Sequence, residues 1–243
     1  MRSNLDNPST TEIHKSIIQN KKYLKCIYTE YYKLIASEFS KNQKILELGS
    51  GGSFLKIFLP QLITSDILLL NGIDLVIDAQ NMDVESESLD GIVMVDVLHH
   101  IPDVTLFFNQ ARRVLKDQGK IVMVEPWNSK WSYFIYKYIH HEDFNPHTNR
   151  WSFDSSGPLS GANGALPWIV FERDIEIFRH KYPEFILTRI DKFMPFSYIL
   201  SGGLSYNYSF PHKLYKFIRT IENKFFNNKF SMFCFICLKY SPK

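Results

Sequence analysis

Four acidic side chains lie within or directly after short apolar runs in the first part of the chain. Glu47 lies in the apolar run 44–48, and Asp66, Asp78 and Asp96 each close a later run. If these runs are parallel strands, their carboxyl ends meet at one edge of a sheet, where open α/β folds bind ligands. We therefore predict that the three carboxylates at strand ends, Asp66, Asp78 and Asp96, gather around one ligand.

A glycine-rich turn follows the first run. Gly49, Ser50 and Gly51 come directly after Leu48, where a strand passes into a helix. Glycine lets the backbone turn tightly and approach a ligand with no Cβ in the way. The start of a helix adds free N–H groups. The turn by itself is common to many nucleotide-binding folds.

The acid at the end of the second strand indicates which kind of ligand this edge of the sheet binds. A carboxylate at this place can accept hydrogen bonds from both hydroxyls of a ribose. We assign this role to Asp66. A rival assignment to Asp74 ranks lower, because residues 73–77 resemble the interior of a strand. The expected ligand is a cofactor that contains a nucleoside.

Two histidines, His99 and His100, follow the fourth apolar run. A neutral imidazole at this edge could accept a proton from a hydroxyl or amine. The alternative is that the two rings cap the next helix or pack beneath a cofactor. Both interpretations stay open from the sequence alone.

The elements that must position these residues alternate along the chain. Near-continuous apolar runs predict strands at 44–48, 62–66, 73–78, 91–97 and 120–124, and a helical stripe covers 103–116. Such runs are typical of a parallel sheet with helices on both faces. A short helix is expected over 53–59, whereas the helix between the second and third strands must be absent or vestigial.

Three motifs in this region resemble class I S-adenosylmethionine-dependent methyltransferases. They are residues 45–53 (ILELGSGGS), residues 89–93 with 97–103 (LDGIV and VLHHIPD), and residues 113–122 (RVLKDQGKIV). The resemblance covers about residues 44–126. It implies a Rossmann-like, doubly wound, mostly parallel sheet of seven strands with an antiparallel last strand, for which the run 229–240 is suited.

The resemblance also implies the cofactor, S-adenosyl-L-methionine, and the part of it that each residue would contact. Asp66 would bind the ribose, and Asp78 with Ala79 would lie near the adenine. Glu47 would orient the loop and the cofactor amine. The cofactor-binding residues implied in this way are Glu47, Gly49, Ser50, Gly51, Asp66, Ile67, Asp78, Ala79, Asp96 and Val97.

One departure from the family pattern concerns the glycine-rich turn. The position of the usual third glycine holds Ser53, and Gly52 is offset by one. Serine can cap the start of a helix, so we expect cofactor binding to survive.

We predict a single domain over residues 1–243. Residues 1–40 form a helical cap whose first helix starts with a capping box of Ser9 and Glu12. Residues 41–126 form the cofactor-binding core and 127–165 an aromatic insertion that acts as a lid. Residues 166–243 complete the sheet.

The acceptor is expected to be a small molecule, partly apolar or lipid-linked. Aromatic side chains of the kind that line small-molecule pockets are dense over 127–138, where they include Trp131 and Tyr138, and again over 193–210. Lys213, Lys216 and Arg219 follow on a helix, compatible with an anionic head group or a membrane surface. The oligomeric state does not follow from the sequence.

Two clusters of metal-ligand residue types are not expected to bind metal. His140, His141, Glu142, Asp143 and His147 lack a second ligand group, and adjacent histidines rarely reach one ion. Cys234 and Cys237 are three apart in a predicted strand, so they face opposite sides.

Composition limits the class of protein. The 243 residues carry 28 Lys and Arg against 25 Asp and Glu, too little positive charge for a typical nucleic-acid binder. The tetrad typical of DNA amino-methyltransferases is absent where residues 96–99 (DVLH) stand. Three cysteines, no apolar leader and no bilayer-length apolar run favour the cytoplasm. The alternatives to a methyltransferase are a nucleotide-dependent oxidoreductase of Rossmann type and a non-catalytic cofactor-binding protein.

Overall fold

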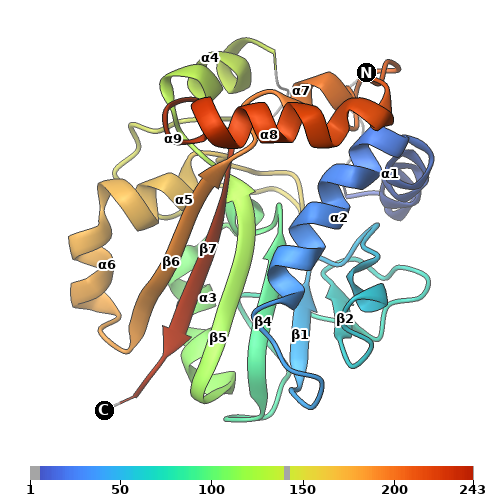
Figure 1. The fold of residues 1–243 in the computed structure, drawn as a ribbon. Coiled ribbons are helices and arrows are strands. Elements are labelled where there is room, and N and C mark those ends of the chain that lie inside the picture. Colours follow the sequence, from blue (N-terminus) through green and yellow to red (C-terminus); the bar gives the residue numbers. More distant parts are fainter. Residues whose placement is uncertain (1–5, 140–142, 243) are drawn as a thin grey trace.

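The computed structural model describes residues 6–139 and 143–242 and contains one seven-stranded sheet (Figure 1). Its strands, in chain order, are β1 (Ile45–Leu48), β2 (Ile63–Asp66), β3 (Leu75–Val76), β4 (Leu89–Val95), β5 (Leu115–Pro126), β6 (Phe185–Phe193) and β7 (Phe233–Tyr240). Their order across the sheet is β3-β2-β1-β4-β5-β7-β6. The pairs among the first five strands are parallel, and β7 runs antiparallel to both β5 and β6. The predicted fold class, with its antiparallel last strand, is confirmed.

Helices cover both faces of the sheet. One face packs on α3 (Val104–Val114), α5 (Leu166–Trp168), the π-helical segment η3 (Ile169–Arg173) and α6 (Ile175–Lys181). The other face packs on α2 (Lys22–Ala36), with α4 (Lys130–Tyr138) near its end. Side chains of the central strands alternate between the two cores. Cys234 belongs to one core and Cys237 to the other, as their spacing predicts.

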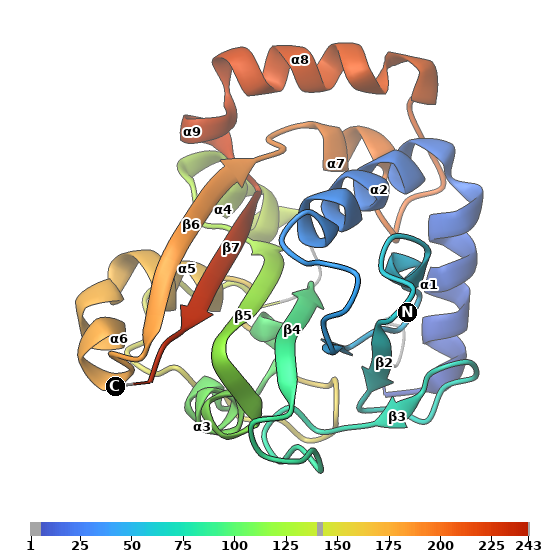
Figure 2. The same cartoon turned by 60° about the horizontal axis from the view of Figure 1, so that its bottom comes forward.

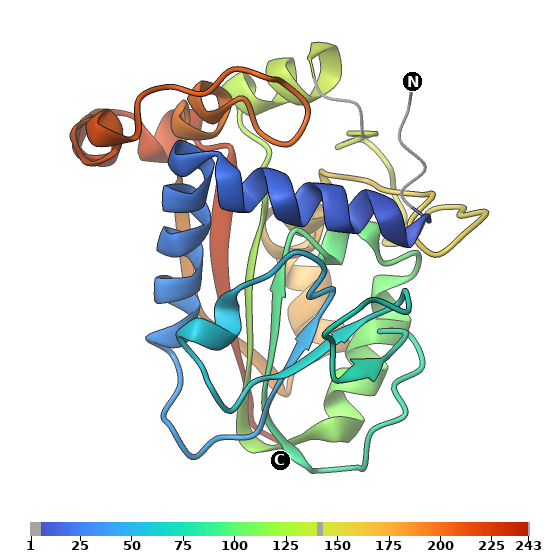
Figure 3. The same cartoon turned by 90° about the vertical axis from the view of Figure 1, so that its right-hand side faces the viewer.

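The carboxyl ends of the parallel strands are covered by α1 (Pro8–Asn20), which lies across them in Figure 3. This helix begins one residue earlier than the predicted capping box. Asn7 is the N-cap, its side chain accepts a hydrogen bond from Ser9 N, and Pro8 takes the first helical position. The predicted capping box of Ser9 and Glu12 is therefore wrong.

The connections among β1, β2 and β3 contain little helix, and the absence of a helix between β2 and β3 agrees with the prediction. The helix predicted over 53–59 is reduced to the single 3-10 turn η1 (Leu55–Ile57), and the link from β2 to β3 holds no helix. The third strand itself shrinks from 73–78 to two residues. Both of its side chains are exposed, so no burial of apolar surface stabilises a longer strand here.

The remaining elements lie at the carboxyl edge of the sheet and beyond it. They are η2 (Leu98–His100), α7 (Ser197–Ser201), η4 (His212–Leu214), α8 (Tyr215–Phe225) and α9 (Asn227–Phe230). Figure 2 shows α8 along the outer rim of the molecule, beyond α7 and α2. Within the described ranges, no helix is both long and apolar enough to cross a bilayer.

Buried ion pairs join α8 to the body of the protein. Arg219 is buried and donates to Glu30 of α2 and to Glu222, each at 2.6 Å. Glu222 is also buried and accepts hydrogen bonds from the backbone N–H groups of Phe196 and Ser197. Arg219, predicted to be part of a basic surface, is instead an internal residue.

Candidate active site

A cavity of about 1010 Å³ lies at the carboxyl ends of β1, β2 and β4, and side chains of α1 form part of its lining. It brings together every site residue predicted from the sequence. The residues of that set on its surface are Glu47, Gly49, Ser50, Gly51, Asp66, Ile67, Asp78, Ala79, Asp96, Val97, His99 and His100. Acids at separate strand ends therefore do share one site.

The glycine-rich turn has a backbone that a side chain would obstruct. Gly49 and Gly51 have φ angles of +65° and +42°, a region that favours glycine. A Cβ at Gly49 would lie 2.5 Å from Val97 Cγ2, in the loop after β4. The turn can thus lie directly against the neighbouring loop.

Glu47 is buried beneath this turn. Its two carboxylate oxygens accept hydrogen bonds from Ser50 Oγ at 2.8 Å and Ser53 Oγ at 2.7 Å. Burial raises the pKa of Glu47 to about 7. Ser53 Oγ also accepts a hydrogen bond from Leu55 N at the start of η1, but the N-cap of η1 is Phe54, so Ser53 is not the N-cap that we expected.

Asp66 lies at the end of β2 on the surface of the cavity. Its carboxylate accepts hydrogen bonds from Gly51 N and Leu68 N, both at 3.0 Å. Burial raises the pKa of Asp66 above its ordinary value. The carboxylate thus ties the glycine-rich turn to the second strand.

The rival acid, Asp74, does not line the cavity. It accepts hydrogen bonds from Lys56 Nζ and from the backbone N and hydroxyl of Thr64. The hydrogen bond from Lys56 is the main reason that the pKa of Asp74 is lowered to about 2. This carboxylate fastens the β2–β3 connection.

Asp78 and Asp96 complete the acidic edge, and both are half-buried. Asp78 accepts a hydrogen bond from Gln80 N. Asp96 has a φ angle of +57°, unusual for a residue other than glycine, and its N–H donates to Val124 O. This backbone turn is where the chain leaves β4 and enters the histidine loop.

The sequence reasoning missed Glu125, which lies at the end of β5 and is fully buried. One carboxylate oxygen accepts hydrogen bonds from Val97 N at 2.9 Å and Leu98 N at 2.7 Å. The other lies 2.7 Å from His99 Nδ1. The rule that selected the other acids, a carboxylate at a strand end, applies equally to this position.

Residues 46–123 match the family model described as the methyltransferase domain. The match covers about a third of the chain and, together with the seven-stranded fold, is consistent with a class I methyltransferase domain. The cofactor predicted from the sequence, S-adenosylmethionine, is the methyl donor of this class. The matched region starts in β1 and ends in β5, so it contains the glycine-rich turn, Asp66 and the histidine loop.

Solved structures share the fold of this chain at low identity. A chain from the Haloferax volcanii complex of the Trm112 methyltransferase activator with a candidate methyltransferase matches with TM-score 0.57 and 9% identity, over 100% of both chains. A Thermotoga maritima S-adenosylmethionine-dependent methyltransferase matches with TM-score 0.53 and 11% identity, over 95% of this chain and 99% of that one.

A third match is phosphoethanolamine N-methyltransferase 2 of Haemonchus contortus, solved with phosphomonomethylethanolamine and S-adenosylhomocysteine. Its TM-score is 0.51 at 15% identity, over 88% of this chain and 53% of that one. No curated protein matches the sequence significantly. At these identities the solved structures establish the fold and not the acceptor.

The two histidines of the methyltransferase domain lie in η2, directly after the turn at Asp96. Their ring centroids are 4.3 Å apart. His99 is buried and bound to Glu125, so its Nδ1–H is donated to a carboxylate and Nε2 becomes the basic nitrogen. His100 is half-buried, and its Nδ1 lies 3.2 Å from Gly161 O.

Aromatic side chains also form part of the cavity surface, and one of them, Tyr32, packs against Phe54 just after the glycine-rich turn. They are Tyr28, Tyr32, Tyr136, Phe144, Tyr198 and Phe233. Trp131 and Tyr138, the residues singled out in the sequence, are not among them. Trp131 Nε1 donates to Pro195 O, and Tyr138 is exposed. Each of the two segments predicted to be rich in aromatics supplies one aromatic side chain to the cavity: Tyr136 from 127–138 and Tyr198 from 193–210.

The suggested cluster of metal-ligand types is only partly visible. His140, His141 and Glu142 lie outside the described residues. Among the residues that are described, no group of three or more His, Cys, Asp or Glu side chains is arranged to hold a metal ion.

The raised pKa of Glu47 predicts a pH-dependent stability. Because the folded-state pKa is about 7 and the ordinary value is 4.5, the folded protein binds the proton more tightly than the unfolded chain. The free energy of unfolding should therefore fall by about 3 kcal/mol as pH rises through this interval. Glu47→Gln, which cannot ionise, should abolish this fall. Urea unfolding measures it at a series of pH values from below 4.5 to above 7.

Asp74→Asn is the control for this measurement. Because the pKa of Asp74 is already lowered to about 2, its contribution is complete above pH 4.5 and does not change through pH 7. Parallel pH profiles for the wild type and Glu47→Gln would contradict the assignment.

Proposed function

We propose that this protein transfers the methyl group of S-adenosylmethionine to a small, partly apolar acceptor. One observation carries the proposal: a single cavity joins the predicted cofactor residues to a set of aromatic side chains. The methyltransferase family match supports the reaction class. Three free cysteines are compatible with the predicted cytoplasmic location.

The residues at the cofactor end fit the proposed donor, which carries an ammonium and a sulfonium group. Asp66 would accept hydrogen bonds from the ribose hydroxyls, and Asp78 with Ala79 and Ile67 would contact the adenine side. The turn of Gly49, Ser50 and Gly51 would lie under the methionine part, beside Glu47, Asp96 and Val97. Six acids line the cavity, and Asp66, Asp78 and Asp96 among them favour a cationic ligand.

S-Adenosylmethionine supplies an electrophilic methyl group whose transfer to a nucleophile breaks the S–C bond and returns the electron pair to sulfur. The protein has to hold the nucleophile in line with that bond, and positioning of this kind accounts for a large part of a rate enhancement. The glycine-rich turn, tied to Asp66, and the loop held by Glu125 provide a rigid surface for it.

The acceptor end is apolar with a few hydroxyl groups. Tyr136 stacks on Phe144 with ring centroids 4.7 Å apart, and its hydroxyl donates to Met232 O. Tyr198 packs edge-on against Phe233 at 5.0 Å. Apolar surfaces with few polar groups are typical of small-molecule sites. They fit a phenol, a polyketide or the apolar part of a lipid-linked sugar better than a nucleic acid.

We further propose that the histidine pair accepts the proton that a hydroxyl or amine acceptor loses. Both rings line the cavity, and Glu125 orients His99. The two alternatives, an oxidoreductase and a non-catalytic binding protein, share the cofactor end with this proposal. Binding and turnover measurements separate them.

Asp66→Ala should weaken the binding of S-adenosylmethionine and of S-adenosylhomocysteine. It removes a charged acceptor, and hydrogen bonds to charged groups are worth about 1.5–3 kcal/mol, or roughly tenfold to hundredfold in affinity. Calorimetry measures both ligands. Asp74→Ala, which changes an acid outside the cavity, should leave both affinities unchanged. Equal losses in the two variants, or tight binding of a nicotinamide dinucleotide instead, would refute this cofactor site.

Tyr136→Ala should raise the KM for the acceptor and leave the cofactor affinity unchanged, because it enlarges only the aromatic end. Turnover is followed as S-adenosylhomocysteine formed with a panel of phenols, fatty acids and lipid-linked sugars. Tyr138→Ala is the matched control, since Tyr138 belongs to the same helix but is 64% exposed and outside the cavity. If Tyr136→Ala lowers cofactor affinity without altering acceptor kinetics, the aromatic end serves the cofactor instead.

Substitution of the proton acceptor should lower kcat by about a hundredfold or more, the usual contribution of a general base. His99→Gln and His100→Gln are compared in single variants, with cofactor affinity as the check on folding. The affected variant should also lose the acid limb of the pH–rate profile. Wild-type kcat and pH profile in both variants would show that positioning alone drives the transfer.

A further inference from the structure

An apolar stripe on α8 faces solvent. Its side chains follow helical spacing on one side of η4 and α8: Leu214, Phe217, Ile221 and Phe225. Phe217 is 64% exposed and Phe225 is 63% exposed. Isolated exposed apolar residues are ordinary, whereas a continuous exposed apolar patch marks a binding surface.

The opposite side of α8 is fixed to the body of the protein. Tyr215, Arg219 and Glu222 are buried there, and Arg219 forms ion pairs with Glu30 and Glu222. These contacts determine the rotation of the helix about its axis. The exposed stripe is therefore held outward by the fold.

Lysines flank the stripe. Lys213, Lys216 and Lys224 are exposed on η4 and α8. Residues 192–243 hold eight Lys and Arg and a single acid, Glu222, whose carboxylate is buried and paired with Arg219. The rest of the chain has more acids than bases, so positive charge is concentrated in this C-terminal part.

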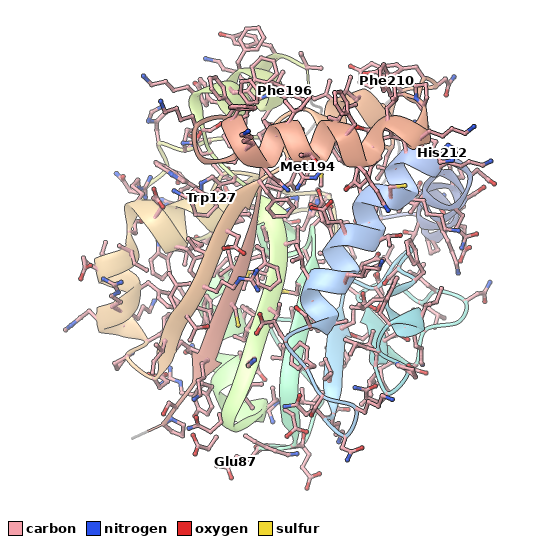
Figure 4. The ribbon with its side chains drawn as sticks, in the orientation of Figure 1. Glu87, Trp127, Met194, Phe196, Phe210 and His212 are labelled. Carbon is pink, nitrogen blue, oxygen red and sulfur yellow. The ribbon has the colours of Figure 1, made fainter. Side chains whose placement is uncertain are left out.

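Neighbouring elements also expose aromatic side chains and lysines. In α4, Phe134 and Tyr138 are exposed, and Lys137 lies over the Tyr138 ring. The segment before α8 exposes Tyr206, Tyr208 and Phe210. α9 contacts both α4 and α8, and Figures 1 and 2 show these elements at one end of the molecule. In Figure 4, Phe210 and His212 mark one end of α8 and Phe196 lies toward the other.

We propose that this aromatic–lysine face, made of α4, the 206–210 segment, α8 and α9, docks on the surface of a bilayer that contains anionic lipids. Aromatic and aliphatic side chains enter the interface between head groups and acyl chains, and lysines bind the negative surface. With 11 residues, α8 would lie in the plane of the interface. This inference is independent of the proposed reaction, although Leu204 and Ser205 of the cavity directly precede the face.

The absence of exposed carboxylates supports an anionic surface over a typical protein partner. Among the side chains that the structure describes on these four segments, the one carboxylate is the buried Glu222. A single-stranded nucleic acid would also tolerate lysines and aromatics, but it would not require the aliphatic Leu214 and Ile221 beside them. Nucleic-acid binding is accordingly an outcome of the test.

The test is sedimentation of the full-length protein, without cofactor, with two kinds of vesicle: phosphatidylcholine alone, and phosphatidylcholine mixed with phosphatidylglycerol. We expect binding to the mixed vesicles that weakens as salt rises. The triple variant Lys213→Gln, Lys216→Gln, Lys224→Gln should lose about fivefold in affinity for each lysine. The double variant Phe217→Ser, Phe225→Ser should lose at least about tenfold.

Matched controls change equally exposed residues elsewhere. Ile57→Ser with Leu69→Ser removes two side chains that are 73% and 79% exposed, and Lys33→Gln, Lys41→Gln, Lys181→Gln removes three exposed lysines. Both control variants should bind vesicles like the wild type, and retained cofactor affinity shows that all variants fold. No vesicle binding, equal losses in the controls, or binding to single-stranded RNA and not to vesicles would overturn the proposal.

Discussion

The carboxyl edge of the sheet poses a problem of unpaired backbone groups. Strands end there inside a cavity, so N–H groups that leave the sheet need acceptors away from bulk water. Buried carboxylates supply them. Glu125 accepts from Val97 N and Leu98 N, and Asp66 accepts from Gly51 N and Leu68 N. These hydrogen bonds fix the geometry of both loops on the cavity surface. The two acids therefore have a structural role in addition to any contact with a ligand.

The use of buried carboxylates at the strand ends makes the cavity differ in charge from the outer surface of the molecule near α8. Acids that complete the backbone at the strand ends, such as Asp66, also place carboxylates on the cavity surface, whereas burial raises the pKa of Glu47 to about 7, so that this acid is partly protonated at neutral pH. On the described residues of α4, the 206–210 segment, α8 and α9, lysines are exposed and the one acid, Glu222, is buried and paired with Arg219, so this outer surface is positive. A cationic ligand inside and an anionic surface outside are thus compatible with one small domain.

Strand-end acids could be predicted from sequence because position at the end of an apolar run is a local property. The same reasoning extends to Glu125, which was missed. Local patterns do not reveal which partner an aromatic or charged side chain meets. Trp131 bonds to Pro195 and Arg219 to Glu30, in segments distant in sequence. The third strand was overestimated for a related reason, since Leu75 and Val76 are apolar but exposed.

The offset glycine of the turn has a consequence for sequence change in this protein. A Cβ at Gly52 would lie 2.8 Å from the Cα of Lys15 in α1. Because the obstructing atom belongs to the backbone, no substitution of Lys15 can make room for it. A descendant of this sequence that acquires a side chain at position 52 must therefore also reroute its first helix. A change at Gly52 therefore requires a simultaneous change in the position of α1.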